Sequence, residues 1–223
     1  MKNFQEYAQS ILITDSILPR LQELHPDGKF CIGNDCPIYW RVSESLEKGS
    51  TVPDWFYVSG VSPTLDGEVK PYYDFWQDLL APKMVIEFID EDDEEEWNKT
   101  PYEGKFWIYE TVIKPSYYVI FEVKKASVEI YELFAGQYIK VSPNSRGHYP
   151  IKVLDTELGI WQGHFLLDKE LSWLRWWDEA GNLLLTGDER AKAERQRAEN
   201  AEKENARLRE QLGSLGVDPD TMD

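Results

Sequence analysis

Two apolar runs of strand length are separated by a segment long enough for a helix. The runs are MVIEFI at residues 84–89 and YYVIFEV at residues 117–123, and both are rich in β-branched and aromatic residues, which predicts strands. Similar runs precede and follow them, DWFYV at residues 54–58 and SVEIYEL at residues 127–133. A strand, a helix and a strand in this order predict a βαβ unit, and therefore an α/β (α+β) fold in which helices flank a central mixed β-sheet.

The segment between the two apolar runs carries the signals of a helix start. Thr100 is a candidate N-cap, Pro101 stands at the first helical position, and Glu103 can return a hydrogen bond to the cap. We therefore predict a helix from about residue 101 to residue 112. One or two further helices are predicted in the first 28 residues, where apolar side chains recur at helical spacing before a Pro-Asp-Gly turn.

The chain changes character after Gly187. Before it come short strands and turns, including a hairpin predicted to turn on DEAGN at residues 178–182. After it the a positions of successive heptads are Ala191, Ala198, Asn205 and Leu212, and the d positions are Glu194, Ala201, Leu208 and Leu215. This pattern predicts a coiled coil, and an asparagine at an a position favours a parallel homodimer. A single solvated, charged helix is the alternative.

We expect a globular domain over residues 1–187, a coiled-coil helix over residues 188–216 and a flexible tail over residues 217–223. The chain has no run of about 20 apolar residues that could cross a membrane and no secretion signal at its N-terminus, so we expect a cytoplasmic protein. The two cysteines, Cys31 and Cys36, are too few for a zinc site or a disulfide scaffold, which indicates a reduced thiol pair.

The charge balance argues against tight binding to nucleic acid. The chain has 24 Lys and Arg residues against 41 Asp and Glu residues, a formal net charge of -17. Affinity for DNA depends largely on Lys and Arg side chains at the phosphates. Part of the negative charge is local, in the run DEDDEEE at residues 90–96. A run of this kind is typical of a solvated loop, and a metal-collecting loop is disfavoured because adjacent carboxylates repel one another and no turn-forming glycine is present.

Three carboxylates on or beside the predicted strands could take part in phosphodiester hydrolysis: Asp54, Glu87 and Glu122. A metal-dependent phosphodiesterase needs carboxylates to hold the ion and commonly a lysine near the scissile phosphate. Glu122 and Lys124 share one face of their strand, as such a pair would. Their place at a strand end, directly before the next strand, instead indicates a strand that runs into a hairpin.

Glu87 is the carboxylate whose position is hardest to explain by structure alone. It lies inside MVIEFI with apolar neighbours on both sides, where a charge without a cationic partner is costly. Lys105, on the predicted helix that follows, is a candidate partner, although an ordinary surface lysine is the commoner fate of a helical lysine.

These stretches resemble a known family. VPDWFYVSG, APKMVIEFID and GKFWIYETVIKPSYYVIFEV are similar to motifs of the Uma-two family of bacterial restriction endonucleases, over roughly residues 50–135. RGHYPI, LGIWQG and WWDEAGNLLLTG, followed by a heptad tail that ends in GVDPD, resemble the long form of that family.

The resemblance implies a restriction-endonuclease-like fold of the PD-(D/E)xK type over residues 1–187. It implies Asp54 and Glu87 as ligands of Mg²⁺ or Mn²⁺ and Lys105 as the catalytic lysine, moved from a strand to a helix. It gives Glu122 no catalytic role. The leading hypothesis is a magnesium-dependent, homodimeric DNA endonuclease that cleaves phosphodiester bonds through a metal-bound water. The alternatives are a non-catalytic dimeric interaction protein that keeps the nuclease fold, and a phosphodiesterase that acts on RNA.

Overall fold

The computed structural model describes residues 4–41, 49–90 and 94–215. Part of the acidic run, residues 91–93, and the predicted flexible tail, residues 217–223, therefore lie outside the described residues. The chain divides into two compact units, residues 1–184 and residues 185–223, and each is described by itself.

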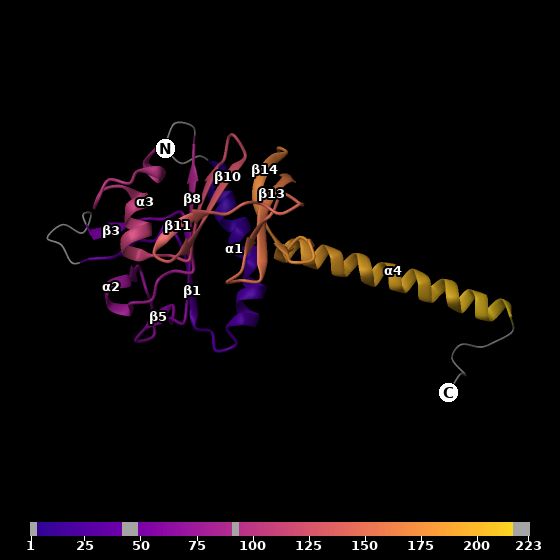
Figure 1. The fold of residues 1–223 in the computed structure, drawn as a ribbon. Coiled ribbons are helices and arrows are strands. Elements are labelled where there is room, and N and C mark those ends of the chain that lie inside the picture. The colour runs from indigo at the N-terminus through magenta and orange to yellow at the C-terminus, as the bar shows by residue number, and fades with distance from the viewer. Residues whose placement is uncertain (1–3, 42–48, 91–93, 216–223) are drawn as a thin grey trace. The chain divides into compact units, whose positions relative to one another are not determined.

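A six-stranded sheet forms the centre of the first unit (Figure 1). In spatial order its strands are β1 (Phe30–Asn34), β4 (Trp55–Ser59), β8 (Met84–Ile89), β9 (Tyr117–Glu122), β10 (Ser127–Phe134) and β11 (Gln137–Lys140). β8 and β9 are parallel and all other neighbours are antiparallel. The predicted fold class and the parallel βαβ unit are confirmed, because the crossover between β8 and β9 contains the helical segment.

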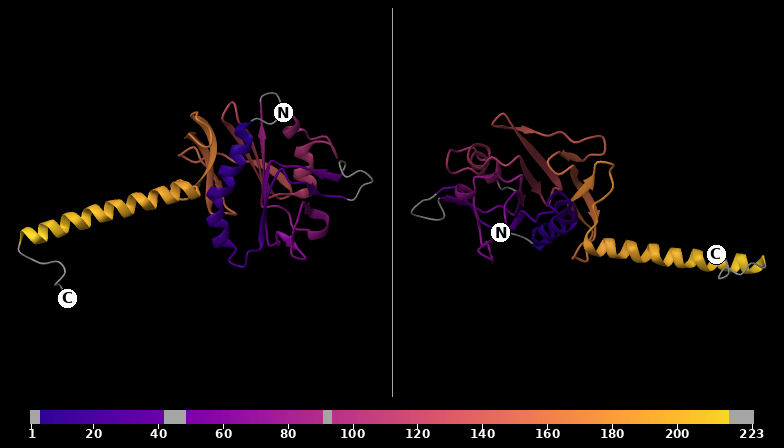
Figure 2. Two further views of the ribbon diagram at one scale, coloured as in Figure 1. Left: turned by 180° about the vertical axis from the view of Figure 1, so that it is seen from behind. Right: turned by 90° about the horizontal axis from the view of Figure 1, so that it is seen from below.

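One face of this sheet packs against α1 (Phe4–Leu24) and a second sheet, and Figures 1 and 2 show both on the same side. The second sheet contains β12 (Tyr149–Ile151), β13 (Thr156–Gly163) and β14 (Leu171–Asp178). Met84, Ile86 and Phe88 of β8 are buried in this layer. Gln9 ties α1 to β14, because its side-chain amide donates to the Leu174 carbonyl oxygen at 2.7 Å and accepts from the Leu174 N–H at 2.9 Å.

The opposite face carries short helical segments and small strand pairs. These are α2 (Phe75–Asp78), η2 (Glu95–Trp97), α3 (Lys105–Trp107), the π-helical turn η3 (Ile108–Ile113), β2 (Ile38–Tyr39), β3 (Ser50–Thr51) and β7 (Tyr73–Asp74), with the hairpin of β5 (Thr64–Leu65) and β6 (Glu68–Val69) nearby in sequence. Because side chains alternate along a strand, Val85, Glu87 and Ile89 of β8 face this layer. The candidate carboxylate Glu87 thus lies on the side of the sheet that α3 covers.

The helix predicted from residue 101 to residue 112 was wrong at its start. Residues 101–103 form a turn in which the Thr100 carbonyl oxygen accepts from the N–H groups of Glu103 and Gly104, at 3.2 and 2.9 Å. Tyr102 has a φ of 68°, which a helix cannot contain. Helical structure begins only at Lys105, after Gly104 as N-cap, with no side-chain capping bond.

The predictions for the turn at residues 178–182 and for the C-terminal helix are closer to the structure. Asp178 begins the predicted turn: its N–H donates to the Asn182 carbonyl oxygen at 2.8 Å, although the main partner of β14 is β13. In the second unit, α4 runs from Gly187 to Ser214 and starts with a capping box between Thr186 and Glu189.

Within the described residues, none of the helices is both long and apolar enough to span a membrane.

Candidate active site

Asp54 and Glu87 occupy facing positions of two neighbouring strands. Glu87 lies in the middle of β8 and is 1% exposed, and Asp54 directly precedes β4 and is 5% exposed. Trp55 stands opposite Ile86 in the antiparallel register, which places Asp54 opposite Glu87. The Phe88 N–H donates to Asp54 Oδ2 at 2.5 Å. The structure therefore brings these two predicted site residues together.

The third predicted site residue, Lys105, reaches the same place from the first turn of α3. Its Nζ lies 3.4 Å from Glu87 Oε2. Tyr109 stands four residues later, on the same side of the helical segment, and donates its hydroxyl to Glu87 Oε1 at 2.7 Å. Glu87 is therefore not sealed in apolar packing, because each of its oxygens has a polar or charged partner.

Glu96 is a member of the cluster that the sequence did not indicate. It is the last carboxylate of the acidic run and is 2% exposed. Its Oε1 lies 2.6 Å from Lys105 Nζ, and its Oε2 accepts from the Tyr118 hydroxyl at 2.8 Å. In the sequence, the tryptophan at position 97 was the one available sign that the end of the acidic run turns into the core.

Burial and mutual repulsion shift the proton affinities of the cluster. Burial raises the pKa of Glu87 well above its ordinary value, the charges of Glu96 and Asp54 add to this, and Lys105 opposes it. Burial likewise raises the pKa of Glu96, and Lys105 again opposes the change. For Lys105, burial would lower the pKa, but Glu87 and Glu96 outweigh it and the net pKa is raised. The lysine is therefore an ammonium group at any physiological pH.

A pocket of about 720 Å³ lies beside the cluster, and Lys105 is part of its wall. Thr51, whose hydroxyl is 3.3 Å from that of Tyr109, also lines it. Trp40, Arg41 and Tyr102 contribute aromatic and cationic groups to its lining. Its volume lies within the range of pockets that hold a ligand of nucleotide size.

The donor set fits a hard divalent cation. Asp54, Glu87 and Glu96 supply three carboxylates against the single ammonium of Lys105, so the fully ionised cluster carries excess negative charge. Within the residues that the structure describes, no group of three or more His, Cys, Asp or Glu side chains is arranged to hold a metal ion. Two carboxylates are sufficient for Mg²⁺, which commonly completes its shell with water and substrate phosphate.

The Glu122 and Lys124 pair does not join this cluster. Glu122 lies at the end of β9, where Lys125 Nζ approaches its Oε1 at 2.5 Å and Ser127 donates to its Oε2 at 3.3 Å. Lys124 Nζ lies 3.8 Å from Asp90 Oδ2. These contacts agree with the interpretation of a strand that runs into a hairpin.

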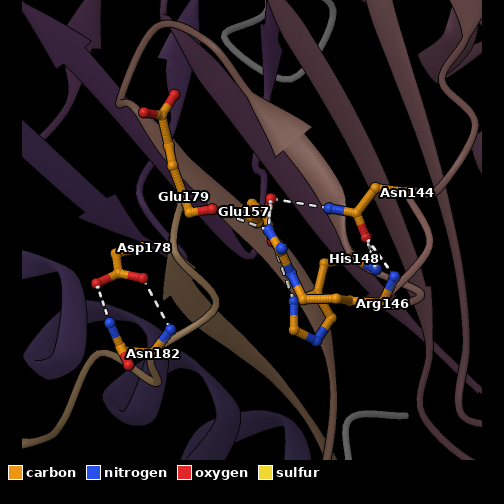
Figure 3. Close-up of polar contacts among 7 residues, drawn as sticks. All are labelled: Asn144, Arg146, His148, Glu157, Asp178, Glu179 and Asn182. Carbon is orange, nitrogen blue, oxygen red and sulfur yellow. Dashed lines mark hydrogen bonds and ion pairs between the residues drawn. The ribbon is translucent and has the colours of Figure 1, made fainter.

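A second polar cluster surrounds Glu157 on β13 (Figure 3). Its Oε1 accepts from Asn144 at 2.8 Å and pairs with Arg146 at 2.5 Å, and its Oε2 lies 3.1 Å from His148 Nδ1. Burial would raise the pKa of Glu157, but these hydrogen bonds lower it below the ordinary value. Both oxygens are occupied by side chains of one loop, so this cluster fastens the loop to the sheet.

Comparison with known proteins gives a family and likenesses among solved structures. The model of the Uma2 (Uma-two) family, described as "putative restriction endonuclease", matches residues 1–168. The search of curated proteins finds no match. A solved structure titled as a putative nuclease belonging to DUF820 from Anabaena variabilis ATCC 29413 is 14% identical, with a TM-score of 0.42, and the match covers 69% of this chain and 82% of that one.

Proposed function

Because the chain belongs to the Uma2 family of "putative restriction endonucleases", as the sequence resemblance indicated, we propose that it is a magnesium-dependent endonuclease that cleaves DNA. One observation carries this proposal: Lys105 Nζ lies 3.4 Å from Glu87 Oε2, in a buried cluster that also contains Asp54. These residue types are the ones that metal-dependent phosphodiester hydrolysis requires.

Each residue has a defined task in this proposal. Asp54 and Glu87 would hold Mg²⁺ or Mn²⁺, which when bound lowers the pKa of a water molecule and neutralises phosphate charge. Tyr109 orients the Glu87 carboxylate through the 2.7 Å hydrogen bond to Oε1. The ammonium of Lys105, at the wall of the pocket, would stabilise the charge that develops on the phosphate oxygens in the transition state.

The direct test is nicking of supercoiled plasmid DNA in Mg²⁺ or Mn²⁺ by the wild type, Glu87→Gln and Glu122→Gln. We expect Glu87→Gln to reduce the rate at least about 100-fold, because a metal ligand is removed. Glu122→Gln is the matched control and should retain the wild-type rate. Undiminished cleavage by Glu87→Gln would exclude this site, and parallel assays with single-stranded RNA decide between DNA and RNA as substrate.

We also propose that the protein is a homodimer through α4. In a parallel, in-register pair, Asn205 faces its copy at an a position. Two g positions then face opposite charges at the e positions of the partner helix: Arg197 meets Glu202, and Glu204 meets Arg209. Arg190 and Arg195 form the one like-charged pair. This balance of charges supports a parallel homodimer and would place two nuclease sites in one assembly.

The second candidate function is a non-catalytic dimeric interaction protein. The net charge of -17 favours it, because a strongly acidic chain repels DNA. The two candidates differ in metal binding: the nuclease must bind Mn²⁺ through Asp54 and Glu87, and the interaction protein need not. Absence of Mn²⁺ binding to the wild type, by calorimetry, would favour the second candidate.

A further inference from the structure

Glu96 is held in place as firmly as the predicted site residues. Its main-chain carbonyl oxygen lies 3.2 Å from the Tyr118 hydroxyl, which also donates to its carboxylate. The neighbouring Trp97 donates from Nε1 to Glu129 Oε2 at 3.2 Å, which ties η2 to β10. Both ends of Glu96, main chain and carboxylate, are thus attached to the central sheet.

The segment that carries Glu96 is also locked against the start of α3. A Cβ atom at Gly104 would come within 2.0 Å of the Asn98 carbonyl oxygen, so the two backbones approach more closely than any other residue type allows. Gly104 directly precedes Lys105. The contact therefore fixes the distance between the Glu96 segment and the origin of the lysine side chain.

Glu96 and Glu87 share the Lys105 ammonium unequally. The ammonium lies 2.6 Å from Glu96 Oε1 and 3.4 Å from Glu87 Oε2. The other oxygen of Glu96 accepts from the Tyr118 hydroxyl, so both of its oxygens have close donors within the cluster. The shorter contact of Lys105 is with Glu96, which is not one of the two proposed metal ligands.

We infer that Glu96 is a positioning residue that takes the shorter contact with the Lys105 ammonium, so that the lysine stays at the pocket wall and competes less with the metal for Glu87. The effect on metal binding rests on the proposed function, whereas the contact between Glu96 and Lys105 does not. Without the charge of Glu96, the ionised Glu87 carboxylate, whose Oε2 lies 3.4 Å from the Lys105 ammonium, becomes a stronger competitor for it. The lysine then pairs with Glu87 and competes with the metal for it.

The test compares Glu96→Gln, Glu96→Asp and the control Glu94→Gln in the full chain. Glu96→Gln removes the charge and keeps the shape, so circular dichroism should show an unchanged fold. Glu94 is exposed and belongs to the same acidic segment, so Glu94→Gln makes the same charge change away from Lys105. Mn²⁺ affinity is measured by calorimetry, and exchange of the Lys105 ammonium protons with water is measured by ¹⁵N NMR.

We expect Glu96→Gln to weaken Mn²⁺ binding about 10- to 100-fold and to lower kcat for plasmid nicking by a similar factor with little change in KM. Glu96→Asp should restore part of the loss, and Glu94→Gln should match the wild type. Proton exchange at Lys105 should be faster in Glu96→Gln than in the control.

The outcomes separate this inference from the proposed function. If Glu96→Gln and Glu94→Gln have the same Mn²⁺ affinity and the same proton exchange at Lys105, the inference is wrong, whatever the nuclease activity. If the wild type neither binds Mn²⁺ nor cleaves DNA, the proposed function fails. The proton exchange then decides alone whether Glu96 holds the lysine: faster exchange in Glu96→Gln supports the contact, and unchanged exchange rejects it.

Discussion

At the scale of single residues, the cluster around Glu87 is arranged at the expense of stability. A carboxylate that is 1% exposed and repelled by Glu96 and Asp54 is poorly stabilised by one lysine that it shares. Such an arrangement is typical of functional sites, where groups are kept in environments that shift their pKa values. Stability should therefore improve when the site is disabled.

Glu87→Gln should raise the free energy of unfolding by about 1–3 kcal/mol at pH 8 in the absence of divalent metal. The effect depends on pH. The folded wild type keeps a proton on Glu87 that the unfolded chain releases near its ordinary pKa of 4.5, so wild-type stability falls as the pH rises from that value towards the raised pKa. The difference between the variants should be small near pH 4. Urea unfolding at several pH values measures it, and a constant difference would contradict this explanation.

At the scale of elements, the geometry of the candidate site depends on where α3 begins. The turn at residues 100–103 and the close contact of Gly104 with Asn98 place Lys105 at the first helical position. The i, i+4 spacing then puts Tyr109 on the same side, so that one short helical segment supplies two partners of Glu87. A shift of this start would misplace both side chains at once.

Gly104→Ala should destabilise the protein by about 1–3 kcal/mol, because the new methyl group overlaps the Asn98 carbonyl. It should also reduce plasmid nicking, since Lys105 moves with the backbone. Gly213→Ala is the control: an added Cβ there meets nothing within 4 Å, and alanine favours a helix. Thermal unfolding of both variants measures the effect, and equal melting temperatures would show that the contact is unimportant.

At the scale of the whole molecule, the proposed cleavage of DNA would depend on both the acidic net charge and the heptads of α4. A net charge of -17 would weaken binding to DNA, and a dimer with two sites would partly offset this through a higher local concentration. None of the described residues of α4 is buried within a single chain. Even the apolar side chain of Leu208 is 45% exposed. A second copy of α4 would cover such side chains.

Leu208→Glu should weaken the dimer at least about tenfold, because it places a charge at a d position of the seam. Ala206→Glu introduces the same charge at an exposed b position and should leave the dimer intact. Sedimentation equilibrium on the full chain gives both dissociation constants. A wild type that stays monomeric at tens of micromolar concentration would instead support the single solvated helix.

The candidate site could be predicted in part, because some of its residues stand out in the local sequence and others do not. Glu87 stands out as a charge within an apolar strand, Asp54 and Lys105 were candidates from their places beside a strand and on a helix, and the family resemblance assigned their roles. Glu96 was missed, since carboxylates precede it in the acidic run, and its burial depends on long-range packing that only Trp97 hinted at. The start of α3 was predicted too early, because Thr100 and Pro101 fit a helical cap locally while the backbone turns at Tyr102.

The amino-acid pattern was sufficient to predict β4, β8, β9 and β10, the strand–helix–strand unit of β8 and β9, and the helix α4, because these follow from the local spacing of apolar residues and from end signals. The order of the strands across the sheet was not predictable in this way, because it depends on pairing between distant segments. The identity of the carboxylate closest to Lys105 became known only from the three-dimensional packing. That choice depends on the packing of η2 against α3, between residues that are near one another in the chain but whose backbone path is set by distant contacts to Tyr118 and Glu129.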